Sequence, residues 1–234
     1  MSKTNTTTVD VALQNDPIAA SFAGLGAAMI FDAMHALGLP NGVMDGRVRH
    51  LSGDPIVGRA RTINRSTAAS NARQTNFDVG LSMGVQQVID SARPGDILII
   101  AMGGDASGAT WGANMATRAA ALGALGIVTD GAVRDVIEMP DIGISVYAQG
   151  TSPRVNFQHV VTLSINEPVI CGGVLVAPED IVVADHDGVI VIPADQAEDV
   201  VKKAQALHET EQKMQQAVRD GMGLVDAIRQ YKIR

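Results

Sequence analysis

The chain has little cysteine, few aromatic residues and no long apolar run, and each shortage narrows what the protein can be. Its single cysteine, Cys171, cannot form an intrachain disulfide, which favours a small buried apolar side chain in a reducing compartment. Aromatic residues make up 3% of the 234 residues, so Val, Ile, Leu, Ala and Met have to build the core. No stretch approaches the ~18 consecutive apolar residues of a membrane span, and Met1 to Asp10 has no apolar signal-peptide segment. We therefore expect a cytoplasmic protein without a membrane partner.

A basic stripe is also missing. The chain carries 25 acidic and 18 basic residues, for a formal net charge of −7, whereas a nucleic-acid-binding protein usually shows clustered Lys and Arg. We therefore expect no nucleic-acid partner. Hydrophobic residues make up 46% of the chain and glycines number 24, which is typical of a compact core joined by tight turns. We predict a disordered leader at residues 1–12 and a single domain at 13–234.

The pattern of apolar residues predicts a mixed α/β fold. Helices are expected at 17–37, 76–92, 112–122, 194–219 and 224–231, and strands at 57–63, 97–102, 127–130, 160–165, 180–184 and 188–192. Residues 97–102 are apolar at every position, as in a strand covered on both faces. Strand, helix and strand follow one another within residues 97–130. This order predicts a βαβ unit with parallel strands and a right-handed crossover.

Ligands of open α/β sheets bind outside the carboxyl ends of the strands, and two loops of this unit leave such ends. One loop leads into the helix that begins near Gly112, and the other carries Arg134 and Asp135. The first turn of a helix has free N–H groups and favours an anion. The amides that could hold a carboxylate belong to Gly112, Ala113, Asn114 and Met115.

Arg134 and Asp135 could complete such a site. A guanidinium group is suited to holding a carboxylate or an enolate oxygen, and an aspartate is a hard oxygen ligand for Mg²⁺ or Mn²⁺. The spacing therefore predicts a site for a small 2-oxo acid beside a divalent metal. On spacing alone, an adjacent Arg-Asp pair is more often a solvated surface feature, and both interpretations stay open at this point.

Several motifs resemble the RraA-like family. They are Gly95 to Leu98, Trp111-Gly112, Gly131 to Asp135 and Asp185 to Pro193, within a resemblance that spans about Ile30 to Val200. Its most specific feature is a glycine at a helix start followed 22 residues later by Arg-Asp, here Gly112 and Arg134-Asp135. The family contains class II 4-hydroxy-4-methyl-2-oxoglutarate/4-carboxy-4-hydroxy-2-oxoadipate aldolases and the RraA regulators of ribonuclease E.

The resemblance implies a fold, an assembly and an activity. The family fold is a layered β/β/α swivelling domain, here with a central βαβ unit and C-terminal helices from about residue 194, assembled as a homotrimer or hexamer. The activity is that of a metal-dependent lyase that cleaves a C–C bond of a 4-hydroxy-2-oxo acid and releases pyruvate, with oxaloacetate decarboxylation as a side activity. The implied cofactor is Mg²⁺, Mn²⁺ or another divalent cation.

The family's functional residues carry over by position. Amides at the helix start, here Gly112, Ala113, Asn114 and Met115, bind the pyruvyl carboxylate. The catalytic pair is Arg134, which contacts substrate, and Asp135, which binds the metal. The aldolases commonly have Gly-Glu-Leu-Leu at the helix start, where this chain has Gly-Ala-Asn-Met. Amide binding survives that change, but the missing glutamate at position 113 leaves the natural substrate open.

The sequence leaves two other functions open, and it suggests roles for several further residues. The alternatives are a non-catalytic regulator that binds a ribonuclease and an enzyme of the same fold that acts on another hydroxy acid or lactone. Asp135 favours an enzyme, because the regulators tend to lack the metal-binding acid. Trp111 is expected to pack at the loop–helix junction, with a place in a pocket wall as the lesser option. Asp105 is expected to form a turn, with a place in the metal shell as the lesser option. Asp185 and Asp187 are also expected to form turns, and His159 and His186 to be structural or exposed. Asp130 either caps its strand or faces the site.

Overall fold

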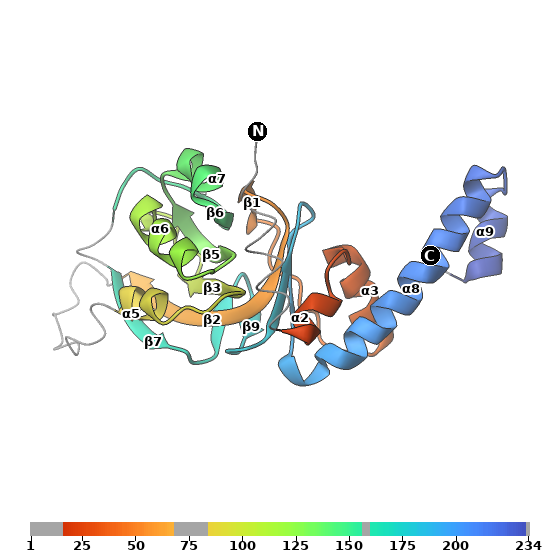
Figure 1. Cartoon of the computed structure of the whole chain (residues 1–234), viewed down its shortest axis with the longest axis horizontal. Helices are drawn as coiled ribbons and strands as arrows, with labels where there is room; N and C mark the ends of the chain where they lie inside the picture. Colours follow the sequence, from red (N-terminus) through yellow and green to blue (C-terminus); the bar gives the residue numbers. More distant parts are fainter. Residues whose placement is uncertain (1–15, 68–83, 156–159, 233–234) are drawn as a thin grey trace.

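The computed structural model describes residues 16–67, 84–155 and 160–232. The expected leader, residues 76–83 of the helix expected at 76–92, and His159 lie outside these ranges. Within them the chain forms a nine-stranded mixed sheet flanked by helices, in which β2 runs as a long curved strand (Figure 1). The mixed α/β prediction is confirmed.

The sheet has a parallel centre and antiparallel edges. Its order is β1 (Arg49–Ser52), β6 (Ser145–Thr151), β5 (Gly126–Val133), β3 (Asp96–Ala101), β2 (Ile56–Thr67), β10 (Ile181–Ala184) and β11 (Val189–Ile192). The strands β2, β3, β5 and β6 are parallel to one another, whereas β1, β10 and β11 pair antiparallel. Two further strands pair beside this path, β4 (Ala109–Trp111) with β5 and β7 (Val160–Ile165) with β2.

Strand β3 shows why the central run is apolar throughout. Ile97 and Ile99 pack on one face, in a cluster with the hairpin of β8 (Val169–Cys171) and β9 (Val174–Val176). Leu98 and Ile100 pack on the other face, in a cluster with the helices α5 (Gly84–Asp90), α6 (Ala113–Ala121) and α7 (Met139–Ile142). Successive side chains of a strand point to opposite faces, so the hairpin, sheet and helices form the expected β/β/α layers.

The predicted βαβ unit is confirmed. Strands β3 and β5 are parallel neighbours, with Ile97 opposite Gly126 and Ile100 opposite Thr129, and α6 connects them. Strand β5 continues to Val133, beyond the predicted end at residue 130. The short strand β4, which the sequence pattern did not indicate, pairs with this extension and leads directly into α6. The two extensions bring residue 112 and residue 134 side by side.

The first predicted helix is wrong in one respect, because residues 17–37 form two helices. Helix α2 (Pro17–Ser21) and helix α3 (Ala27–Ala36) are separated by a turn in which Gly24 has φ +81°, a conformation that favours glycine. Asp185 accepts a hydrogen bond from the Ala27 amide (2.8 Å), so the start of α3 is capped by a residue far along the chain. Both helices pack against β10 and β11.

The expected C-terminal helices are present as η2 (Ala194–Gln196), α8 (Ala197–Arg219) and α9 (Leu224–Tyr231). The buried residues of α8 are Ala197, Val200, Val201 and Ala204, all near its start. Its remainder projects from the sheet with α9 alongside, at the opposite end of the molecule from α5 and α6 (Figure 1). Among the described helices, none combines the length and the hydropathy that crossing a membrane requires.

Candidate active site

The two predicted halves of the site meet at the start of α6. The Ala113 amide donates a hydrogen bond to Oδ2 of Asp135 (3.0 Å), and the Arg134 amide donates to the carbonyl oxygen of Trp111 (3.0 Å). Asp135 therefore caps α6 from the loop that follows β5, and the positive end of the helix dipole stabilises its carboxylate. The Arg-Asp pair lies at the ends of the strands beside the helix start, and its two side chains are partly buried, 38% and 33% exposed.

Asp135 has an unusual backbone conformation. Its φ of 58° and ψ of 29° lie in the left-handed region, where aspartate is one of the few non-glycine residues found. A residue in this region costs about 1 kcal/mol or more and is retained where the surrounding structure needs it. Here the conformation brings the carboxylate to the helix start, with Nε of Arg134 3.4 Å from Oδ2.

Gly112 is required at the helix start for reasons of space. Its φ of −165° is extended and open to any residue. A Cβ atom at this position would lie 2.8 Å from Oδ2 of Asp135 and 2.9 Å from Nε of Arg134. The glycine that the sequence motif singles out therefore makes room for the Arg-Asp pair.

The four predicted amides are not equivalent. The Ala113 amide is bonded to Asp135, and the Met115 amide donates to the carbonyl oxygen of Gly112 (3.1 Å). Asn114 lies between them, and its side chain lines the adjoining pocket. A ligand carboxylate would have to share the amides of Ala113 and Met115 with these protein acceptors.

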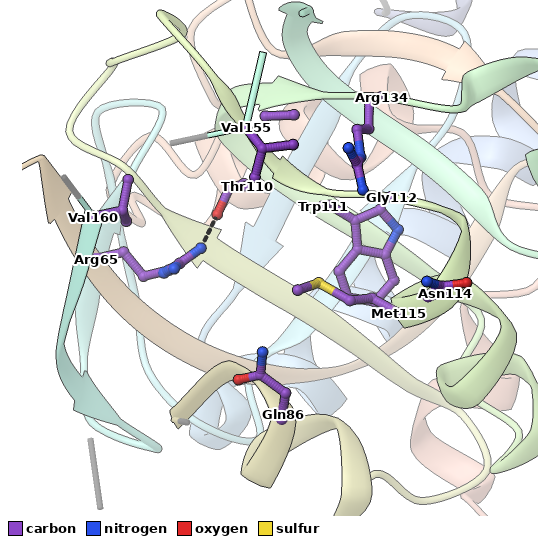
Figure 2. A pocket seen from close by; sticks show the side chains of 11 residues that line it. Arg65, Gln86, Thr110, Trp111, Gly112, Asn114, Met115, Arg134, Val155 and Val160 are labelled. Atoms are coloured by element: carbon purple, nitrogen blue, oxygen red, sulfur yellow. Dashed lines mark hydrogen bonds between the residues drawn. The ribbon is translucent and has the colours of Figure 1, made fainter. Parts of the chain in front are cut away.

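A cavity of about 180 Å³ opens beside the helix start (Figure 2). Of the predicted site residues, Gly112, Asn114, Met115 and Arg134 line it, whereas Ala113 and Asp135 are joined to each other at its edge. Trp111 is 2% exposed and is also part of the wall. Its predicted packing role is correct, and the role as pocket wall, which was ranked lower, holds as well.

Arg65 is a residue of this pocket that sequence analysis missed. It lies near the end of β2, and its guanidinium group donates a hydrogen bond to Oγ1 of Thr110 (Figure 2). Its Nε is buried and has no hydrogen-bond partner among the described residues. Burial lowers the pKa of Arg65 to about 10, so the group still carries its charge near neutral pH. No sequence signal separates Arg65 from the other arginines of β2.

The remaining polar residues have structural roles. Asp130 is buried and accepts hydrogen bonds from the amides of Met102 (2.6 Å) and Gly104 (3.1 Å), so it holds the loop that follows β3. Asp105 accepts from the Ser107 amide (2.8 Å), which confirms the predicted turn.

The turn at residues 185–188 is also confirmed. Asp185 accepts from the amides of Asp187 (2.8 Å) and Gly188 (3.3 Å). His186 packs edge-on against His50, with ring centroids 4.7 Å apart. The described lining of the pocket beside α6 does not include this histidine, so its predicted structural role stands.

The surroundings of Asp135 suit a metal ion that is also bound by the substrate better than one held by protein side chains alone. Across the described ranges, no cluster of three or more His, Cys, Asp or Glu residues could hold a metal ion. Oδ2 of Asp135 faces the Ala113 amide and Arg134, which leaves Oδ1 for a ligand. Mg²⁺ is often bound by one or two carboxylates, with water and substrate oxygens as the other ligands. The residues present therefore fit a cation held jointly by Asp135 and a bound substrate.

The geometry describes a pocket at the carboxyl ends of parallel strands, lined by Arg65 and Arg134, with Asp135 at the helix start beside it. Comparison with known families identifies the family of the chain. The family model RraA-like, described as Aldolase/RraA, matches residues 27–191. The chain belongs to the RraA-like family.

Individual relatives of the chain carry the name of an aldolase. The chain is 33% identical over 178 residues to a Halalkalibacterium halodurans protein named "Putative 4-hydroxy-4-methyl-2-oxoglutarate aldolase", covering 76% of this chain and 77% of that one. It is 30% identical over 109 residues to the 4-hydroxy-4-methyl-2-oxoglutarate aldolase of Thermus thermophilus, covering 47% of this chain and 66% of that one.

A solved structure shares the fold as well. Streptomyces coelicolor RraAS2, described as an unusual member of the RNase ES inhibitor RraA protein family, matches with a TM-score of 0.76 and 27% identity, covering 86% of this chain and 98% of that one. The expected RraA-like fold is therefore confirmed.

Proposed function

We propose that this protein is a divalent-metal-dependent lyase that cleaves a C–C bond of a 4-hydroxy-2-oxo acid and releases pyruvate. The observation that supports the proposal is the hydrogen bond from the Ala113 amide to Asp135, because the Arg-Asp pair then lies at a helix start, where an anion is favoured. The names of the aldolase relatives support the same reaction.

The chemistry needs charge stabilisation at one end of the substrate. When the C3–C4 bond breaks, the 4-hydroxyl group loses its proton to a base and C4 becomes the carbonyl carbon of the second product. The bonding electron pair forms the enolate of pyruvate, which takes up a proton at C3 before pyruvate leaves. The start of α6 would bind the C1 carboxylate, and the Arg134 guanidinium would stabilise the negative charge that develops on the 2-oxo oxygen. Trp111, Val155 and Val160 line the pocket with apolar surface, which strengthens these interactions by excluding water.

Asp135 would hold the Mg²⁺ or Mn²⁺ ion through its remaining oxygen while it caps α6. When bound, the cation supplies Lewis-acid stabilisation of the enolate. Decarboxylation of oxaloacetate passes through the same enolate, so oxaloacetate is proposed as a second substrate.

We also propose that the protein assembles as a homotrimer or hexamer. Ile137, two residues beyond Asp135, is 90% exposed. The family resemblance implies this assembly, and an apolar side chain as exposed as Ile137 is available for a subunit contact. Light scattering of the purified chain tests this proposal, and a monomer would contradict it.

A non-catalytic regulator that binds a ribonuclease is the second candidate, and its support is the likeness to the Streptomyces protein. A regulator has no need of a small pocket lined by two arginines, nor of an aspartate held at the helix start in a strained conformation. These features favour the lyase.

The test is a pyruvate-release assay with 4-hydroxy-4-methyl-2-oxoglutarate, 4-carboxy-4-hydroxy-2-oxoadipate and oxaloacetate, in Mg²⁺ and in EDTA. We expect release that requires the metal, and losses of roughly 100-fold or more in kcat for Arg134→Ala and Asp135→Asn. Asp135→Asn is preferred to alanine because its amide oxygen can still accept from Ala113. The control is Arg118→Gln, which removes an exposed arginine paired with Asp90.

Two results would contradict this proposal. Absence of pyruvate from all three compounds in Mg²⁺ would rule out the lyase activity. Turnover that EDTA leaves unchanged would rule out the role of the metal and of Asp135 as its ligand.

A further inference from the structure

Arg65 is a buried cation whose partner is missing from the described residues. Its Nε has no hydrogen-bond acceptor, and the acceptor of its guanidinium NH1 group, Thr110, is a neutral hydroxyl group. The ion pairs of the described residues include the neighbouring arginines of the same strand, Arg59 with Asp16 and Arg61 with Asp96, but none that involves Arg65. A buried charge is unfavourable unless it is paired, so the position indicates an anion that binds there.

The location of Arg65 indicates where in the pocket such an anion would bind. Figure 2 shows the guanidinium groups of Arg65 and Arg134 entering the pocket from opposite sides, one from β2 and the other from the loop after β5. The volume of about 180 Å³ suits a small molecule. A ligand with its first carboxylate at the start of α6 and Arg134 would extend toward Arg65.

We propose that Arg65 forms a second anion-binding subsite opposite Arg134, and that it selects substrates with a distal carboxylate over those with a single carboxylate. The inference rests on the proposed function for the orientation of the substrate. It makes Arg65 a specificity-determining residue, with 2-oxo dicarboxylates as the ligand class.

The physical reason for selectivity is the cost of leaving Arg65 without a partner. A dicarboxylate replaces the missing acceptor with a charge-assisted hydrogen bond. A monocarboxylate of the same length fills the pocket and leaves the guanidinium group desolvated and unpaired. Sites with buried donors discriminate strongly against ligands that lack the matching acceptor. Discrimination should therefore depend on position 65 and be absent once the charge is removed.

The first experiment measures binding without turnover. Calorimetric titration compares 2-oxoglutarate with 2-oxopentanoate, in wild type, Arg65→Met, Arg65→Lys and the exposed control Arg118→Met. We expect wild type to prefer 2-oxoglutarate. Arg65→Met should lose roughly 10- to 100-fold in affinity for 2-oxoglutarate, with the affinity for 2-oxopentanoate changing less than about twofold. Arg65→Lys should keep part of the preference, because it keeps the charge but not the planar fork.

The second experiment measures kinetics with 4-hydroxy-4-methyl-2-oxoglutarate and the monocarboxylate 4-hydroxy-2-oxopentanoate. Loss of a binding contact far from the reacting bond should raise KM for the dicarboxylate in Arg65→Met, with a smaller change in kcat. A merely structural role would instead lower activity toward both substrates. The ratio of the two kcat/KM values should move toward one in Arg65→Met and stay near the wild-type value in Arg118→Met.

Each outcome decides the inference. Equal affinity of wild type and Arg65→Met for 2-oxoglutarate would overturn it, and so would equal losses for both ligands. If Arg65→Met does not fold, the decision passes to Arg65→Lys, and an affinity loss that is equal for the two ligands in this folded variant would overturn it. If no compound yields pyruvate but 2-oxoglutarate binding still depends on position 65, the proposed reaction fails and the subsite stands.

Discussion

The arginines at the two ends of strand β2 differ in their partners. At the amino end, Arg59 and Arg61 are paired with Asp16 (2.6 Å) and Asp96 (2.8 Å). Toward the carboxyl end, Arg65 enters a pocket where its described hydrogen-bond partner is a threonine hydroxyl group. The three residues are all arginines of one strand, so the difference in their partners comes from the elements that pack beside each of them.

The comparison separates arginines that stabilise the fold from an arginine that is kept for a ligand. A paired arginine offsets a buried carboxylate, so its removal should destabilise the protein. An unpaired buried arginine reduces stability. Natural proteins retain such a destabilising residue mainly where function requires it. Stability measurements along β2 can therefore test the assignment of Arg65 without any knowledge of the substrate.

The largest expected effect is at Arg61. Asp96 is 2% exposed, and Arg61→Met would leave its carboxylate with the Arg93 amide as its nearest described donor. Breaking a buried ion pair costs about 3 kcal/mol or more. We expect the free energy of unfolding, measured by urea denaturation, to fall by about that amount. An unchanged free energy of unfolding would show that Arg61 contributes no more to stability than Arg65 does.

Gly112→Ala should have an intermediate effect, at the site end of the molecule. The added methyl group would meet Asp135 and Arg134 at distances below 3 Å, and such overpacking costs about 1–3 kcal/mol. It would also displace the Arg-Asp pair, so we expect at least a tenfold loss in pyruvate release. Wild-type activity in Gly112→Ala would contradict the requirement for a close approach at this helix start.

Arg59→Met should cost less, about 1 kcal/mol, because the Arg59–Asp16 pair is partly exposed. Its effect should depend on pH. The hydrogen bond from Arg59 lowers the pKa of Asp16 below its usual 3.8. A lowered pKa gives stability that is present above the unfolded-state value and is lost as the pH falls through the folded value.

Denaturation curves of wild type and Arg59→Met should therefore differ by a constant amount from pH 6 to 8 and converge below about pH 4. A difference that grows on acidification would show that the pair does not control Asp16.

Arg65→Met should show the smallest effect, with a free energy of unfolding equal to that of wild type or higher. The change removes a desolvated charge that has no carboxylate partner in the described residues. Thermal unfolding without ligand measures it. A melting temperature well below that of wild type would show that Arg65 stabilises the fold, as the paired arginines of β2 are expected to do.

The sequence predicted what depends on local patterns. The continuous apolar run at 97–102, the Ala-rich stretch at 112–122 and the glycines after each of them predicted the βαβ unit. The motif from Gly112 to Asp135 predicted that the Arg-Asp pair and the helix start belong to one site. Strand β4 escaped prediction because three residues carry too little periodicity. The break between α2 and α3 escaped because it depends on Asp185, which reaches Ala27 only in the folded protein.

Arg65 escaped prediction for a different reason. Whether an arginine on a strand meets a carboxylate depends on the order of the strands. The β2–β3 pairing brings Asp96 next to the amino end of β2, whereas Arg65 near the carboxyl end lies beside Thr110 in β4. Such pairing is a property of the assembled sheet, so the partner of each arginine could be read only from the structure.

The most direct test is a crystal structure of the protein with Mg²⁺ and 2-oxoglutarate, which has a carboxylate at each end and no 4-hydroxyl group to cleave. We predict that one carboxylate binds at the start of α6 beside Arg134, with the metal on Asp135, and that the other binds Arg65. Density for the ligand elsewhere, or in this pocket with Arg65 uncontacted, would contradict the account.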